Sequence, residues 1–325
     1  MTTQDSAASG SAGAGAASSP AAPSGSAGAG AAASPLDTVS PTSARPTEST
    51  VRIGLVLPDV MGTYGDDGNS LILRQRLRWR GHDAEIVRIT LDDEVPDSCD
   101  IYAVGGGEDA AQKLASRHLA GSPGLQRAAA RGVPVLAICA GMQVFGEWFV
   151  VSDGSRAPGL GLLDITTSPQ TARSIGELVV QPKLDGLTQQ LTGFENHMGA
   201  TVLGPDASPL GRVLAGTGNG VPADSDAVAS PASAPAPAGA GATSGAGATS
   251  GAANASGAGA TSGGRVEGVV QSSIIATYMH GPVLARNPEL ADLLLCRALG
   301  VESLPPVDVP AVEQLRRERI AAAGR

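Results

Sequence analysis

The chain has 325 residues and a formal net charge of −9. A nucleic-acid-binding surface needs a basic face, and this acidic, lysine-poor composition argues against one. No apolar run approaches the roughly 20 residues of a membrane span, and the N-terminus lacks the basic and apolar regions of a signal peptide, so we expect a cytoplasmic protein.

Two stretches are predicted to be disordered. Residues 1–50 and 221–264 consist mainly of Ala, Gly, Ser, Pro and Thr. Such segments bury too little apolar surface to offset the entropy of ordering. The remaining roughly 230 residues suit one α/β domain over 51–300, interrupted by the second stretch and followed by a C-terminal tail, 301–325.

The first half of this domain alternates strands with helices. Its fourth strand, VPVLAI, is apolar throughout, as expected for a central parallel strand covered on both faces. The alternation predicts βαβ units in a doubly wound, mostly parallel sheet. Strands are expected at 52–57, 84–89, 101–104 and 133–138, with helices at 70–80, 109–117 and 123–131.

Beyond residue 150 the pattern changes to short strands with Gly-rich turns. The stretch 221–264 falls between two of these strands and is expected to extend a surface hairpin loop. A late helix is expected from the Asn287-Pro288 start to Gly300, and another over 310–323. The short strands are expected at 177–180, 201–203, 211–215 and 266–278.

Cys139 stands where a buried strand gives way to a helix, in VPVLAICAGMQVFGEWF, with small residues on both sides. This pattern is typical of a nucleophile elbow, a tight turn that exposes one side chain at the sheet edge. The helix N-terminus favours a thiolate there, and the N–H of Ala140 is placed to stabilise an oxyanion. A lone cysteine is more often an inert core residue, which is our interpretation of Cys99 and Cys296. Three cysteines without a CxxC spacing also argue against a disulfide framework or a structural zinc site.

A thiolate nucleophile needs a base, and the sequence has four histidines. His82 and His118 belong to stretches expected on the surface. His197 lies beside glycines in GFENHMGA, and His280 ends an apolar strand before Gly-Pro. The sequence pattern leaves both His197 and His280 as candidates for the base.

Five motifs resemble the glutamine amidotransferase domain of the cobyric acid synthase type, a class I (triad) family. Within it, GFENH and the loop before the first helix favour the GatD family, the glutaminase subunits of lipid II isoglutaminyl synthase. The resemblance covers about residues 51–220 and 265–300, and it implies a flavodoxin-like fold. The motifs are YGDDGN at 64–69, DIYAVGGGED at 100–109, AICAGMQVFG at 137–146, GFENHMG at 193–199 and TYMHGPVL at 277–284.

The resemblance implies a role for each catalytic residue. Cys139 would attack the side-chain amide of glutamine and form a thioester. His280 would be the base, which later protonates ammonia and activates water. Gly106, in the Gly105–Gly107 loop, would donate its N–H to the oxyanion together with Ala140.

The resemblance also implies two substrate-binding residues. Arg173, in TARSIGE, would hold the α-carboxylate of glutamine with two parallel hydrogen bonds. Without the family, a loop arginine in solvent would be the better interpretation. Gln143 would lie near the substrate, and an ordinary residue in the first turn of a helix is an equal alternative.

A partner subunit is expected because the sequence has no phosphate-binding GxxxxGK[ST] loop. We expect no cofactor in this chain, and ATP on a MurT-type, Mur-ligase-like subunit of a heterodimer. The complex would amidate the D-glutamate of lipid II to D-isoglutamine during peptidoglycan synthesis, which supports cell wall biogenesis and cell shape.

One departure from the family concerns the group that orients the base. The family pattern His-x-Glu is broken, because Gly281 and Pro282 follow His280. We expect the partner subunit, rather than another residue of this chain, to supply the missing carboxylate. The Asp66-Asp67 pair is expected to form a solvated turn that caps a helix, rather than a partner contact or a cation site.

Three other functions stay open. The chain could serve another acceptor, as in cobyrinate-type amidation. It could be a free-standing Cys hydrolase of the same fold, which Arg173 and the two histidine motifs disfavour. It could also be a scaffolding subunit without activity, which the intact pair of Cys139 and His280 disfavours.

Overall fold

The computed structural model describes residues 49–220 and 265–323. The disorder predicted for 1–50 and 221–264 lies outside the described residues, except for residues 49 and 50. The described residues form an α/β fold with two six-stranded sheets. Strands that follow one another between helices build the first sheet, as the alternating sequence pattern predicts.

The first sheet has the order β11-β12-β4-β3-β1-β2, in which every pair is parallel except β11 with β12. The central strands β3 and β4 are buried at every position because helices cover both faces of the sheet. The sequence-based strand at 266–278 is three short strands in the structure. The bounds are β1 (Val51–Val56), β2 (Ala84–Ile89), β3 (Ile101–Val104), β4 (Val135–Ile138), β11 (Val269–Gln271) and β12 (Ile274–Thr277).

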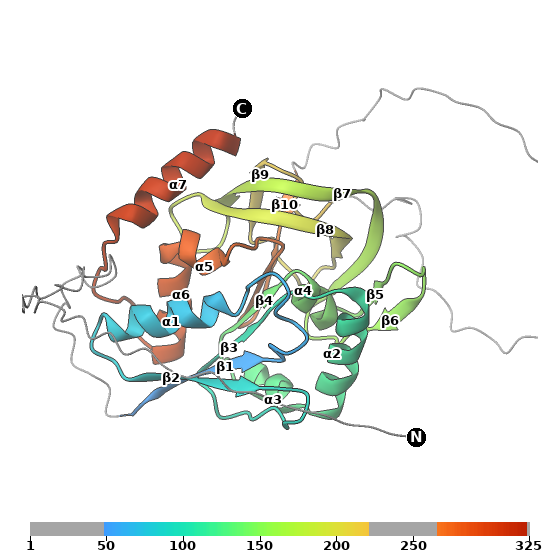
Figure 1. Ribbon diagram of the computed structural model, residues 1–325, viewed down its shortest axis with the longest axis horizontal. Coiled ribbons are helices and arrows are strands. Elements are labelled where there is room, and N and C mark those ends of the chain that lie inside the picture. Colours follow the sequence, from blue (N-terminus) through green and yellow to red (C-terminus); the bar gives the residue numbers. More distant parts are fainter. Residues whose placement is uncertain (1–48, 221–264, 324–325) are drawn as a thin grey trace, which may run out of the picture. The chain divides into compact units, whose positions relative to one another are not determined.

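Helices α1 and α6 lie on one side of this sheet and α3 on the other (Figure 1). Partly buried ion pairs join α1 and the residue Arg80 after it to α6, since Asp292 on α6 accepts hydrogen bonds from Arg76 and Arg80 at 2.6–2.8 Å. Helix α6 begins with Pro288 and ends at Gly300 in the left-handed conformation, as the sequence predicts. The helix bounds are α1 (Gly68–Arg78), α2 (Asp109–Gly121), α3 (Gly124–Ala130), α4 (Ala140–Phe145), α5 (Val283–Arg286) and α6 (Pro288–Leu299).

The second sheet corrects two of the sequence-based strands. The strands expected at 177–180 and 201–203 are parts of two long antiparallel strands, with a register shift between Pro169 and Ser174. Polar side chains and glycines hide their full length, because they break the apolar alternation by which strands are recognised. The sheet consists of β5 (Trp148–Val150), β6 (Arg156–Pro158), β7 (Ile165–Pro182), β8 (Leu191–Leu203), β9 (Gly211–Ala215) and β10 (Val266–Glu267).

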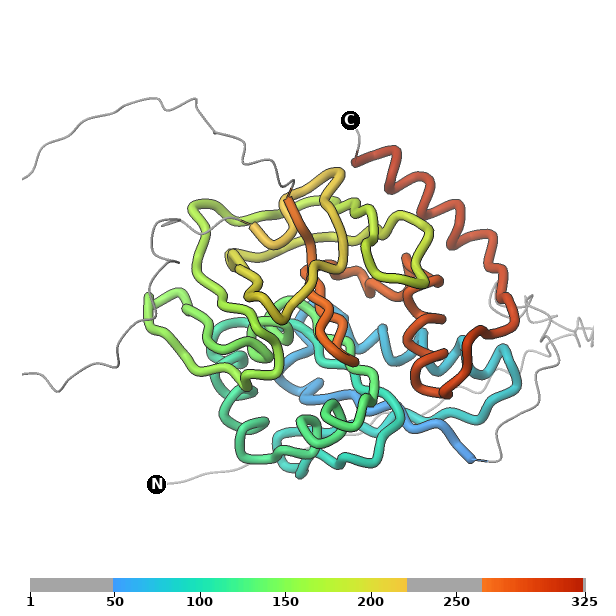
Figure 2. The backbone as a smooth tube through the Cα atoms, turned by 180° about the vertical axis from the view of Figure 1, so that it is seen from behind, coloured from blue at the N-terminus to red at the C-terminus, as the bar shows by residue number. Residues whose placement is uncertain are grey.

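Helix α7 (Pro310–Ala323) spans the last predicted helix and packs against the β7–β8 hairpin, as both views show (Figures 1 and 2). Its one buried residue is Arg316. The guanidinium of Arg316 donates to the carbonyl oxygens of Arg286 and Gln190 and to the side chains of Asn287 and Gln189. A single side chain therefore fastens this helix to two loops.

The prediction that His82 is a surface residue is wrong. Its exposed fraction is 8%, and burial lowers its pKa. The chain turns back at Gly81, whose φ is 79°, and the N–H of His82 bonds to Leu77. His118 is partly exposed, and its Nε2 lies 3.1 Å from the carbonyl oxygen of Asp93. None of the helices within 49–220 and 265–323 is both long enough and apolar enough to cross a membrane.

Candidate active site

Cys139 occupies a strained turn between β4 and α4. Its φ of 51° and ψ of −106° are uncommon for a residue with a side chain, and such strain is typical of functional turns. Its N–H bonds to the carbonyl oxygen of Thr277 at 2.8 Å. At Gly141 a Cβ would lie 2.9 Å from the carbonyl oxygen of Gly105, so this turn requires a glycine there. The local geometry is that of a nucleophile elbow.

His280 reaches the same point from the end of β12. Its backbone pairs with Phe194 of β8 through two hydrogen bonds of 2.8 and 3.1 Å, which fixes where the side chain starts. The imidazole is buried, and its Nδ1 lies 3.1 Å from both carboxylate oxygens of Asp66. Its Nε2 has no hydrogen-bonding partner among the described residues, although Cys139 is near enough to interact with the ring.

Asp66 corrects two expectations. Its exposed fraction is 2%, so it is not part of a solvated turn, and Asp67 starts α1 without a side-chain capping hydrogen bond. The carboxylate beside His280 comes from this chain, whereas we had expected one from a partner subunit. Sequence spacing gave no signal for this contact, because Asp66 and His280 are 214 residues apart.

The charge state of His280 follows from these neighbours. Burial lowers its pKa, but the hydrogen bond with Asp66 and the interaction with Cys139 raise it more, to about 10. A buried imidazolium can stabilise a neighbouring anion, because opposite charges attract each other more strongly where burial limits screening by solvent. The arrangement therefore places a cysteine next to a group that can stabilise negative charge and exchange a proton.

Gly106 does not have the free N–H that we expected. Its N–H donates to Oδ2 of Asp66 at 3.0 Å. Any Cβ at this position would lie 3.0 Å from Cε1 of His280 and 3.4 Å from Cβ of Cys139. Gly106 is therefore packed between the three side chains. The next residue, Gly107, lines the pocket above Cys139, as does Ala140.

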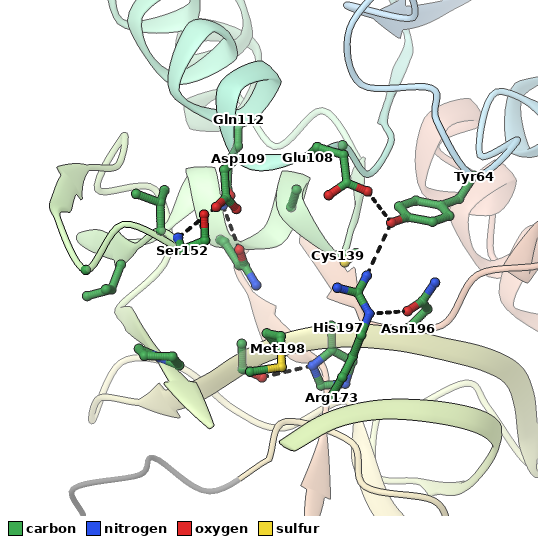
Figure 3. A pocket seen from close by; sticks show the side chains of 18 residues that line it. Tyr64, Glu108, Asp109, Gln112, Cys139, Ser152, Arg173, Asn196, His197 and Met198 are labelled. Atoms are coloured by element: carbon green, nitrogen blue, oxygen red, sulfur yellow. Dashed lines mark hydrogen bonds between the residues drawn. The ribbon is translucent and has the colours of Figure 1, made fainter. Parts of the chain in front are cut away.

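A pocket of about 410 Å³ opens above Cys139. Arg173 of β7 lies across its mouth, where Nε donates to Oδ1 of Asn196 at 2.6 Å and Nη2 reaches the hydroxyl of Tyr64 at 3.4 Å (Figure 3). The structure thus brings Arg173 and Cys139 to one pocket, although 33 residues of chain and a change of sheet separate them in the sequence.

Gln143 lies on α4 at the inner wall of the pocket. Its carbonyl oxygen accepts from Nε2 of Gln112 at 2.6 Å, and its own Nε2 donates to the hydroxyl of Tyr278 at 2.9 Å. These bonds hold the side chain in place and leave one N–H without an assigned acceptor. The side chain of Gln143 is therefore held by hydrogen bonds as part of the pocket wall.

His197, the other candidate base, also lines the pocket. Its Nδ1 lies 2.9 Å from the carbonyl oxygen of Gly199, and its Nε2 lies 3.4 Å from Glu195. The ring stacks on Tyr278 with centroids 3.7 Å apart. Both nitrogens are thus occupied, so the geometry favours His280 over His197 as the partner of Cys139.

Comparisons with known proteins show the family of the chain. Residues 52–233 match the model of the CobB/CobQ-like glutamine amidotransferase domain, which is more than half of the chain. The chain belongs to the CobB/CobQ-like glutamine amidotransferases. In this amidotransferase Cys139, Arg173 and Gln143 line one pocket, and His280 interacts with Cys139. The described residues contain no group of three or more His, Cys, Asp or Glu that could hold a metal ion.

Individual relatives extend the likeness beyond the matched domain. The amidotransferase is 30% identical to the GatD subunit of lipid II isoglutaminyl synthase (glutamine-hydrolyzing) of Staphylococcus aureus, over 83% of this chain and 94% of that one. It is also 30% identical to the GatD subunit of Streptococcus pneumoniae, over 81% and 86%. A cobyric acid synthase of Pelotomaculum thermopropionicum is 34% identical over 41% of this chain and 28% of that one.

Proposed function

We propose that this amidotransferase is the glutaminase subunit of a lipid II isoglutaminyl synthase. It would hydrolyse L-glutamine and pass ammonia to an ATP-dependent, MurT-type partner in the cytoplasm. The partner would use this ammonia to convert the D-glutamate of lipid II into D-isoglutamine. Support for this acceptor comes from the two GatD relatives, since each likeness extends over more than four fifths of the chain.

The observation that carries the chemistry is the meeting of Cys139, His280 and Asp66 below the pocket. In the proposed reaction the Cys139 thiolate attacks the carboxamide carbon of glutamine. The resulting oxyanion would accept hydrogen bonds from the N–H groups of Gly107 and Ala140. His280 would give its proton to the amide nitrogen, which leaves as ammonia and leaves a thioester on Cys139.

The second half of the reaction regenerates the enzyme. Neutral His280 would take a proton from a water molecule, and the hydroxide formed would attack the thioester carbon. Collapse of this second oxyanion would release glutamate and return the thiolate beside an imidazolium. Asp66 would keep Nδ1 of His280 protonated throughout, so that Nε2 is the atom that exchanges the proton.

The proposal is tested by measuring glutamate and ammonia release from L-glutamine by the full chain, alone and with a Mur-ligase-like subunit. Cys139→Ala and His280→Ala should abolish release, because each removes one partner of the proton and thioester chemistry. Cys296→Ala and His118→Ala are matched controls away from the pocket and should retain it. Turnover that survives in Cys139→Ala would reject Cys139 as the nucleophile. No turnover in any combination would reject the glutaminase and favour the alternative Cys hydrolase or scaffold.

The acceptor requires a separate measurement. Lipid II, ATP and L-glutamine should give amidated lipid II with the complex, and the product should disappear with Cys139→Ala unless free ammonia is added. Glutamine hydrolysis without amidation of lipid II would keep the glutaminase and reject this acceptor.

A further inference from the structure

The rim of the pocket carries opposite charges. Among the described residues that line it, Arg173 is the only arginine or lysine, and Glu108 and Asp109 are the only carboxylates. Figure 3 shows Arg173 and Glu108 facing each other, with Tyr64 between them. A cation and an anion on one rim suit a zwitterion, whose two charges each need a partner of opposite sign.

The two carboxylates differ in what they already bind. Oδ2 of Asp109 accepts the backbone N–H of Ser152 at 2.7 Å, a bond that joins the start of α2 to the neighbouring loop. Glu108 precedes α2 and makes no capping hydrogen bond with its side chain. The one hydrogen bond that the described residues give its carboxylate comes from Tyr64, at 2.6 Å. Glu108 is therefore the carboxylate that is available to a ligand.

The Tyr64 hydroxyl contacts both charged side chains. Its hydroxyl donates to Oε1 of Glu108 and accepts the long 3.4 Å contact from Nη2 of Arg173. Burial and the bond to Glu108 raise the pKa of this phenol to about 12, so it remains a donor at neutral pH. The ring also lies 4.8 Å from the His280 ring, centroid to centroid, which places Tyr64 next to the proposed catalytic groups.

We propose that Glu108 and Arg173 together bind the headgroup of an α-amino acid substrate, with Glu108 on the α-ammonium group and Arg173 on the α-carboxylate. This inference rests on the proposed function, since it takes L-glutamine as that amino acid. The Tyr64 hydroxyl occupies the place of the headgroup until substrate arrives. On binding, this hydroxyl moves away, because the ammonium and carboxylate groups of the substrate replace it as the partners of Glu108 and Arg173.

Asn196 orients the Arg173 guanidinium for binding a carboxylate. The bond from Nε to Oδ1 of Asn196 fixes the plane of the guanidinium and leaves its terminal nitrogens for the carboxylate. Such a fork binds a carboxylate with two parallel hydrogen bonds. Glu108 follows directly on Gly107, which lines the same pocket, so the binding group and the proposed oxyanion donor are neighbours in one loop.

The test compares L-glutamine with 4-carbamoylbutanoate, which has the same carboxamide and carboxylate but no α-ammonium group. Glu108→Gln should lower kcat/KM for L-glutamine about 10- to 100-fold, mainly through KM, because it removes a charge-assisted hydrogen bond made equally in ground and transition states. For 4-carbamoylbutanoate the same substitution should change kcat/KM less than about threefold.

Asp109→Asn is the matched control, because it neutralises the adjacent carboxylate without removing the proposed partner of the ammonium group. Any effect it has should be equal for the two substrates, so their kcat/KM ratio stays at the wild-type value. A ratio that falls in Asp109→Asn and not in Glu108→Gln would overturn the assignment of Glu108, while leaving the glutaminase function intact.

Binding to Cys139→Ala, measured by calorimetry, separates this inference from the proposed function. Tighter binding of L-glutamine than of 4-carbamoylbutanoate, lost in Cys139→Ala/Glu108→Gln, would support the headgroup site even if the wild-type chain hydrolysed nothing. Equal binding of the two compounds would overturn the headgroup site even if the wild-type chain hydrolysed glutamine. Binding of neither compound together with no turnover would overturn both.

Discussion

Asp66 is the residue whose role changes most between sequence and structure. It stands in a turn-rich loop, where an aspartate is ordinarily a solvated turn residue. In the fold it is buried, accepts the N–H of Gly106 and faces Nδ1 of His280. A buried carboxylate with two such partners is held in one orientation, so it can in turn orient the imidazole.

We expect Asp66→Asn to lower kcat/KM for glutamine hydrolysis about 100-fold or more, because the imidazole loses the anion that holds its proton on Nδ1. The matched control is Asp67→Asn, which changes the adjacent aspartate and should retain activity. A purely structural role for Asp66 would leave the titration of His280 unchanged. A lower pKa of His280 in Asp66→Asn, measured by NMR, is therefore the deciding observation.

Stability should depend on pH through the same pair. The pKa of His280 is raised from its ordinary 6.5 to about 10 in the folded chain, so the folded state binds this proton more tightly than the unfolded state. The resulting stabilisation is full below pH 6.5 and is lost as the pH rises toward 10. The difference in unfolding free energy between wild type and Asp66→Asn, from urea titrations, should shrink over this range. A difference that stays constant with pH would contradict the assignment.

At the scale of the secondary-structure elements, α7 has one buried residue, Arg316. The guanidinium of Arg316 is buried and bonds to the loops before β8 and around Asn287. Helix α7 contacts β7 and β8, which also carry Arg173 and Asn196 of the pocket. The helix thus braces the outer side of the hairpin that forms one wall of the pocket.

We expect Arg316→Ala to reduce the unfolding free energy by about 2–4 kcal/mol, because four buried or partly buried oxygen acceptors lose a charged donor at once. Arg317→Ala is the matched control on the exposed face of the same helix and should change stability by less than about 0.5 kcal/mol. Urea unfolding of the two variants gives the comparison, and equal effects would show that α7 is held by other contacts.

At the scale of the whole molecule, residues 221–264 interrupt the second sheet without separating the strands beside them. The N–H of Asn219 bonds to the carbonyl oxygen of Val266 at 2.9 Å, and β9 pairs with β10. The chain therefore leaves and rejoins the described fold at one place. A connection between adjacent points can be shortened at little cost in free energy.

Replacement of 221–264 by a short Gly-Ser linker should leave kcat/KM for glutamine within about twofold and the melting temperature within a few degrees, because the paired ends stay in place. Glutaminase assays and thermal unfolding of the shortened and full chains test this expectation. A loss of activity in the shortened chain with unchanged melting temperature would instead give this segment a part in the reaction.

Much of the first sheet could be predicted because its signals are local. Strand 101–104 and helix 310–323 have the expected bounds, and the apolar strand before Cys139 together with small neighbours indicates the elbow. The lengths of β7 and β8 could not be predicted, since polar residues and glycines in them obscure the periodicity of a strand.

The sequence by itself determined the fold class, the nucleophile at Cys139 as a candidate and the family motifs around it. Each of these depends on residues that are close together in the chain. Only the tertiary structure decided that Asp66 faces His280 and accepts the N–H of Gly106. It also decided that Glu108 and Arg173 lie on the rim of the same pocket. Those contacts join residues far apart in the chain, so they exist only once packing has brought their elements together.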